Sequence, residues 1–101
     1  MIVRIWEGKT KNIHGDLYTQ LIEDRDIPGY EKTEGFIKLT FLKRTDGEFT
    51  YFKLLTFWKD VNSLMKFTGP NYEVAVGYDR DKAYLVDFPG TVEHFEQFAK
   101  G

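Results

Sequence analysis

One predicted strand, residues 51–58, carries large apolar side chains on both of its faces. Successive residues of a strand point to opposite faces, so the run YFKLLTFW presents apolar groups to each side. An antiparallel sheet with one face in water shows a cleaner alternation of apolar and polar residues. A chain of 101 residues is expected to form one domain, residues 1–101, with a single modest core. The sequence therefore predicts that a second subunit covers the far face of this strand.

The composition is that of a folded chain rich in aromatic side chains. Hydrophobic residues make up 42% of the sequence and aromatic residues 17%, including nine Phe and six Tyr. Such a content suits either a ring-rich core or a pocket lined by rings, and composition leaves both open. The 14 basic and 16 acidic residues give a net charge of −2, which argues against a broad cationic surface for nucleic acid.

Cysteine is absent, which excludes disulfides, thiol nucleophiles and thiolate metal sites. A chain without cysteine is typical of the cytoplasm, and we expect this protein to be cytoplasmic. No stretch approaches the roughly 20 apolar residues of a membrane span, and no signal peptide is recognisable at the N-terminus. We therefore expect no membrane partner.

Turn and periodicity signals divide the chain into elements in the order β-α-β-β-α-β. Pro28-Gly29 is predicted to end the first helix, Asp46-Gly47 to form a type I′ hairpin turn, and Asp60 to cap the second helix. Strands are predicted at 2–7, 36–44, 49–58 and 91–98. This order predicts an α+β ferredoxin-like fold, in which a four-stranded antiparallel sheet carries both helices on one face. The other face is left for a homodimer through the sheets.

Several segments resemble the antibiotic biosynthesis monooxygenase superfamily, and the resemblance extends over essentially the whole chain. It is carried by the element order, by the helix after Asp60 and by the segments MIVRIWEG (1–8), LLTFW (54–58) and VEHFE (92–96). The resemblance implies a dimeric α/β barrel in which each subunit keeps a pocket between its sheet and its helices. It also implies an activity of that superfamily, either cofactor-independent oxygenation of polycyclic aromatic substrates or oxidative haem degradation.

The haem-degrading branch fits the residues poorly. That branch uses an Asn near the end of the first strand, a Trp in the second helix and a proximal His shortly after it. This sequence has Glu7, Phe67, and Gly77 or Tyr78 at those places. Neither of its two histidines lies where the branch places its axial ligand. Haem degradation is therefore the least favoured activity, and no cofactor is expected.

His94, Tyr78 and Arg4 are the candidate catalytic residues. An imidazole that faces the pocket would serve as a general base, and the alternative is a histidine hydrogen-bonded to a carboxylate at the sheet edge. Arg4 lies among apolar residues of a predicted central strand, where an unpaired charge is costly. Its partner is either a carboxylate such as Glu96 or an anionic or carbonyl group of a ligand.

Four aromatic residues are the candidate pocket lining: Trp6, Trp58, Tyr72 and Phe67. Tyr72, like Tyr78, falls in an irregular stretch after the second helix and offers a flat ring with one polar tip. Ordinary packing is the alternative for each aromatic residue, and for Trp58 in particular, because it ends the most apolar strand.

Metal and nucleotide sites are not expected. His14 and His94 are far apart in the sequence, and no spaced His/carboxylate motif accompanies either of them. The glycines form no phosphate-binding motif.

The favoured function is a cofactor-independent monooxygenase that acts on a small aromatic or quinone-like substrate. The pocket would exclude water while a substrate anion reacts with oxygen, with His94 or a tyrosine assisting proton transfer and Arg4 stabilising negative charge. The alternative is a non-catalytic small-molecule-binding or stress-related homodimer whose pocket is filled by its own aromatics. Cavity volume separates the two, because small-molecule sites span about 300–1,000 Å³.

Overall fold

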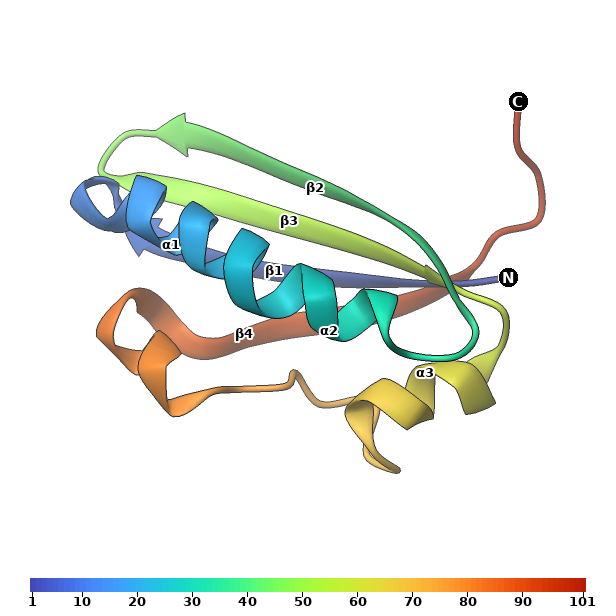
Figure 1. Cartoon of the computed structure of the whole chain (residues 1–101). Coiled ribbons are helices and arrows are strands. Elements are labelled where there is room, and N and C mark those ends of the chain that lie inside the picture. The colour runs from blue at the N-terminus through green and yellow to red at the C-terminus, as the bar shows by residue number, and fades with distance from the viewer.

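The computed structural model describes residues 1–101 and shows one antiparallel sheet with helices over one of its faces (Figure 1). The strands are β1 (Ile2–Lys11), β2 (Phe36–Asp46), β3 (Phe49–Trp58) and β4 (Leu85–Glu96). Their order in the sheet is β2-β3-β1-β4, and every neighbouring pair is antiparallel. The structure confirms the predicted ferredoxin-like α+β fold.

A continuous helical arm follows β1 and runs across the sheet (Figure 1). After a 3-10 turn it comprises α1 (Gly15–Leu21), a π-helical segment (Ile22–Asp26) and α2 (Ile27–Glu31). The prediction that Pro28-Gly29 ends this helix is wrong. Pro28 lies in the first turn of α2, directly after the π-helical segment, and the widened turn of that segment accommodates the proline within the helical arm.

The second helix, α3 (Val61–Thr68), begins as predicted at Asp60, whose carboxylate accepts a hydrogen bond from the Ser63 backbone N–H at 2.8 Å. Residues 69–78 form neither helix nor strand, and a 3-10 turn (Asp79–Ala83) then leads into β4. None of the helices combines the length and apolar character that crossing a membrane requires.

The hairpin between β2 and β3 forms where it was predicted, but with a different turn. Asp46 pairs with Phe49, so the two loop residues are Gly47 and Glu48. Gly47 has a φ of 62°, and Glu48 is not among the residues with positive φ. A glycine at the first central position is the pattern of a type II′ turn, which matches the strand twist as well as type I′ does.

β4 is longer than predicted and is irregular in its first half. It begins at Leu85 and continues through Pro89-Gly90, whereas the last strand was predicted to begin at residue 91. Asp87 and Gly90 have positive φ values of 61° and 88°, and the register with β1 shifts beside them. Proline cannot donate to the strand ladder, and edge positions and bulges are where sheets accept it.

The core lies on the helix-covered face of the sheet. Along β3, alternate residues point to this face and are buried: Thr50, Phe52, Leu54, Thr56 and Trp58. Tyr18 and Ile22 of the helical arm and Leu85 of β4 join this core, whereas Leu17, next to Tyr18, is 60% exposed.

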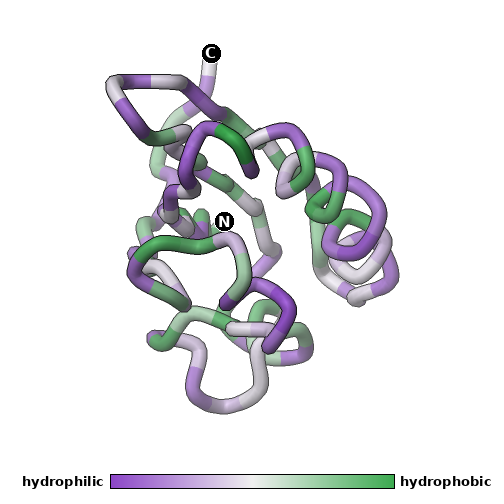
Figure 2. Tube along the Cα trace, turned by 90° about the vertical axis from the view of Figure 1, so that its left-hand side faces the viewer, coloured by the Kyte–Doolittle hydropathy of each residue, from purple (hydrophilic) through white to green (hydrophobic).

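The opposite face of the sheet, called the open face below, is not covered by any element of the chain (Figure 1). Cross-strand pairs such as Val3–Phe57 and Ile5–Leu55 lie on it, because residues paired across the ladder share a face. Hydrophobic and hydrophilic residues are mixed along both the helical arm and the sheet (Figure 2). The two-faced character predicted for β3 is therefore present in the structure.

Gly35 makes a close contact that holds β2 to α3. Its φ is 88°, and a Cβ atom at this position would overlap the Ser63 side chain. We expect Gly35→Ala to lower the free energy of unfolding by about 2–3 kcal/mol, because it adds backbone strain and steric overlap. Gly29→Ala is the matched control, since nothing lies within 4 Å of a Cβ there. Urea unfolding of both variants measures the difference, and equal stabilities would contradict the prediction.

Candidate functional site

A small cavity lies between the sheet and the helical arm, where the pocket was predicted. Its volume is about 30 Å³, which is close to the space that one water molecule occupies. Four of the predicted site residues line it: Arg4, Trp6, Phe67 and Tyr78. It is also lined by residues that the sequence did not single out as functional: Tyr18, Arg25, Asp26, Tyr30 and Asp81.

Arg4, on β1, is 5% exposed and has no carboxylate partner. Its Nη1 donates to the Tyr72 carbonyl at 2.6 Å and lies 2.9 Å from His94 Nε2, and its Nη2 donates to the Val74 carbonyl at 3.3 Å. The expected ion pair with Glu96 does not form, because the register places Arg4 opposite His94 and Glu96 opposite Ile2. Burial lowers the pKa of Arg4, but a guanidinium stays charged at neutral pH.

His94, on β4, serves as the hydrogen-bond acceptor for this buried cation. A guanidinium only donates, so Nε2 must carry the lone pair, and the ring is neutral with its proton on Nδ1. Burial and the neighbouring Arg4 lower the pKa of His94, against a smaller opposing effect of Glu73. The Tyr72 ring packs edge-on against the imidazole, with 5.2 Å between centroids. The Nε2 lone pair of His94 is thus already used by Arg4.

The two tryptophans that were predicted to line the pocket, Trp6 and Trp58, take different places. Trp6 donates from Nε1 to the Pro89 carbonyl at 2.9 Å and keeps its ring at the cavity. Trp58 pairs with Ile2 farther along the sheet, is fully buried, donates to Thr56 Oγ1 at 2.9 Å, and packs on Phe67 without lining the cavity. The position of Trp58 agrees with the core-packing alternative.

A buried charge cluster forms the wall of the cavity on the side of the helical arm. Arg25, in the π-helical segment, donates to the carboxylate of the adjacent Asp26 and from Nη1 to Asp81 Oδ1 at 2.7 Å. The Tyr18 hydroxyl donates to Asp81 at 3.4 Å, and the guanidinium lies 4.1 Å from the Tyr78 ring centre. Asp81 is 3% exposed, although it lies in a run of four charged residues, 79–82.

Three phenols share this environment. Burial raises the pKa of Tyr18, Tyr30 and Tyr78, so each remains a protonated hydrogen-bond donor at neutral pH. Burial likewise raises the pKa of Asp26, and the Arg25 guanidinium partly opposes this effect. Tyr30 lines the cavity, and its hydroxyl forms no hydrogen bond within the chain.

A sequence signal for the missed residues exists in the spacing of the helical arm. Tyr18, Ile22, Asp26 and Tyr30 recur at every fourth position, so they continue one buried stripe. A carboxylate within such a stripe is costly unless it is paired, which makes Asp26 the residue that should have been singled out. Its partners could not be read in the same way, because Asp81 reaches the cluster from 56 positions along the chain beyond Arg25.

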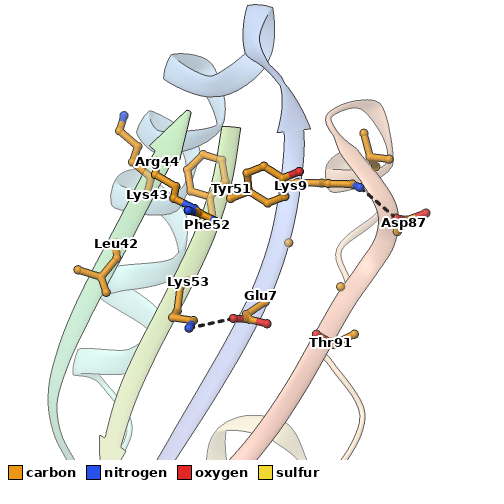
Figure 3. A pocket seen from close by; sticks show the side chains of 13 residues that line it. Glu7, Lys9, Leu42, Lys43, Arg44, Tyr51, Phe52, Lys53, Asp87 and Thr91 are labelled. Carbon is orange, nitrogen blue, oxygen red and sulfur yellow. Dashed lines mark ion pairs between the residues drawn. The ribbon is translucent and has the colours of Figure 1, made fainter. Parts of the chain in front are cut away.

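A second hollow, of about 660 Å³, lies on the open face of the sheet (Figure 3). Its floor carries two ion pairs, Lys53–Glu7 at 3.1 Å and Lys9–Asp87 at 3.8 Å, beside the Tyr51 ring. The larger hollow is thus a charged trough on the side of the sheet away from the candidate site.

No family model and no curated protein matches this sequence. Solved structures match it over nearly the whole chain. A variant of SnoaB, a cofactor-independent oxygenase from Streptomyces nogalater, has a TM-score of 0.65 at 14% identity, and the match covers 98% of this chain and 95% of the SnoaB chain. A MhuD variant with two manganese protoporphyrin IX molecules bound per active site has a TM-score of 0.65 at 17% identity, with coverage of 100% and 98%.

A third match is a Bacillus cereus protein described as an antibiotic biosynthesis monooxygenase. It has a TM-score of 0.64 at 14% identity and covers 99% of this chain and 96% of its own. All three similarities span both the sheet and the helices that enclose the cavity. The chain therefore has the fold of the antibiotic biosynthesis monooxygenase-type proteins.

Proposed function

We propose that this protein is a homodimeric oxygenase of the antibiotic biosynthesis monooxygenase type, which admits a small aromatic or quinone-like molecule to the cavity between sheet and helices. The aromatic walls, Trp6 and Phe67, suit a flat apolar ligand, and several polar groups converge on the same space. The fold shared with SnoaB supports this class of reaction.

The observation that carries the proposal is the buried guanidinium of Arg4, a cation that no carboxylate neutralises. It makes three hydrogen bonds within the chain, which leaves part of its five-donor capacity for a ligand. A fixed positive charge in a site that excludes water stabilises a substrate oxyanion and the negative charge that passes to oxygen. The substrate anion supplies the electrons, so the proposal requires no bound cofactor.

The remaining residues receive roles from their positions. Tyr78, at the mouth of the cavity and 38% exposed, would donate a second hydrogen bond to the ligand. Tyr72 packs behind the site on His94. His94 would act by holding Arg4. Its role as a proton acceptor from the substrate remains a prediction, and it would need the Nε2 lone pair that Arg4 occupies.

A second candidate function is supported by the size of the cavity. A volume of about 30 Å³ is far below the range of small-molecule sites. This favours a non-catalytic binding homodimer whose pocket is filled by its own aromatics, and the oxygenase proposal requires residues 70–77 to move. Haem degradation has the least support, because a porphyrin needs a still larger space and Glu7 and Phe67 do not match that branch.

We also propose that two copies pair through their open faces. The Val3, Ile5, Leu55 and Phe57 side chains lie together on this face, and Phe95 beside them is 52% exposed. A sheet face of this kind is commonly buried against another sheet.

Oxygen uptake decides between the two functions. With a panel of dihydroxyaromatic compounds, and haem as a separate arm, we expect substrate-dependent uptake without added metal or cofactor. Arg4→Gln should lower kcat/KM by about 100- to 1,000-fold, as the loss of an oxyanion-stabilising group does elsewhere. Arg80→Gln, at an exposed position outside the cavity, is the matched control. Ligand binding without uptake would favour the second function, and neither binding nor uptake would contradict both.

A further inference from the structure

We propose that Arg4 and His94 form a proton-operated latch over the cavity. In this proposal they hold residues 70–77, called the cover segment below, in the closed position, and protonation of His94 releases the segment so that a ligand can enter. The inference rests on the proposed function, because it concerns access to the same cavity. It makes His94 a positioning residue that acts through Arg4.

The cover segment is joined to the rest of the chain by hydrogen bonds from a single side chain. Arg4 donates to the Tyr72 carbonyl at 2.6 Å and to the Val74 carbonyl at 3.3 Å. The other bond of the segment, from the Val74 N–H to the Asn71 carbonyl, is internal to it. The segment contains no helix or strand, and Val76 contributes to the lining of the cavity. The hydrogen bonds that hold the segment closed therefore depend on where Arg4 is held.

His94 holds Arg4 only while its imidazole is neutral. The two residues face each other across the β1–β4 ladder, and Arg4 Nη1 lies 2.9 Å from His94 Nε2. When the ring gains a proton, both of its nitrogens become donors, and the hydrogen bond becomes a contact between two cations. Such a contact is repulsive beside the buried Arg4, and in this proposal Arg4 moves and its bonds to the cover segment are lost.

The charges around His94 set the direction of the switch. Arg4 of β1 opposes the imidazolium, and Glu73 of the cover segment favours it. Glu96, two residues along β4, lies on the same face of the strand, and the Tyr72 ring covers one edge of the imidazole. Burial and Arg4 together outweigh Glu73 and lower the pKa of His94. We therefore expect release at a pH below the ordinary histidine pKa of about 6.5. The latched form binds fewer protons than the released form, so a fall in pH favours release.

A pH titration of the full-length protein by NMR tests the latch without any substrate. At pH 7.5 we expect His94 to carry its proton on Nδ1. Between about pH 7.5 and 5, the His94 ring and the backbone amides of residues 72–76 should shift together with one midpoint below about 6.5. Acrylamide quenching of tryptophan fluorescence should rise over the same range, because Trp6 lines the cavity and Trp58 is fully buried.

Two variants separate the latch from a general effect of acid. In His94→Gln the side-chain oxygen still accepts from Arg4 but does not titrate, so the shift of residues 72–76 should disappear. His14→Gln removes the only other histidine and should leave the shift unchanged. Persistence of the transition in His94→Gln, separate midpoints in the wild type, or a proton on Nε2 would each overturn the proposal.

The outcomes remain informative if His94→Gln does not fold, because the wild-type protein alone gives the tautomer, the shared midpoint and the rise in tryptophan quenching. A shared midpoint without a rise in quenching would show only the proximity of residues 72–76 to His94 and would overturn the latch. They are also distinct from those of the oxygen-uptake experiment. A shared titration in a protein that consumes no oxygen would overturn the oxygenase and leave the latch intact. Oxygen uptake in a protein whose residues 72–76 do not titrate with His94 would do the reverse.

Discussion

Leu55→Asp is expected to convert a dimer of this protein into a monomer. Leu55 lies on the open face between Ile5 and Thr40 on the neighbouring strands. In a two-fold symmetric interface each substitution occurs twice, so two carboxylates would lose their water within one apolar contact. We expect the dissociation constant to rise at least about 100-fold, which corresponds to about 2.7 kcal/mol.

Sedimentation at micromolar concentration measures this effect. The wild type should sediment at twice the 11.9 kDa of a single chain, and Leu55→Asp at 11.9 kDa. Leu17→Asp makes the same chemical change on the exposed side of the helical arm, where Leu17 is 60% exposed, and should remain dimeric. A wild type that sediments as a monomer would overturn the proposal that two copies pair through their open faces.

Arg25→Met should lower the free energy of unfolding at pH 7 by about 3 kcal/mol. The substitution leaves the side chains of Asp26 and Asp81, which are 10% and 5% exposed, without their cation. Removing one partner of a buried ion pair is costly because the other charge stays buried, and the cost is reduced here because the Arg25 side chain is 22% exposed. Arg80→Met, at an exposed position with no ion pair, should be nearly neutral.

The loss in free energy of unfolding that Arg25→Met causes should become smaller as the pH falls. In the wild type, Arg25 opposes the rise that burial causes in the pKa of Asp26, so its removal raises that pKa further. The folded variant then binds a proton on Asp26 more readily than the unfolded chain does. Its stability relative to the wild type therefore increases as the pH drops from 7 toward the ordinary aspartate range near 4. Urea unfolding at pH 7 and pH 5 measures both effects, and a deficit that does not change with pH would contradict the explanation.

The fold could be predicted because its main signals are local. The apolar pattern of residues 49–58, the glycine turn at Gly47 and the cap at Asp60 each depend on neighbours in the sequence. The helical arm was predicted too short, because its π-helical segment shifts Pro28 into a position where proline is tolerated. The spacing of the hydrophobic residues in the sequence does not indicate the π-helical segment.

The candidate site could be predicted only in part. Arg4 was identified as a buried charge in need of a partner, but the partners proved to be His94 and two carbonyl groups of a loop without regular structure. Arg25 and Asp81 were missed because each compensates the other across a long stretch of chain. A pairing of that kind becomes visible only when the strands and helices have been placed.

The two-residue hairpin turn has a consequence for how the faces of β3 are assigned. Leu54 points toward the core and lines the cavity, and Leu55, one residue later, points to the open face. Since both are leucines in a strand that is apolar on each side, hydrophobicity alone would accept either arrangement. The length of the turn at Gly47-Glu48 fixes the pairing of β2 with β3. A short loop at the far end of the hairpin thus decides which side chains become interior and which become contact surface.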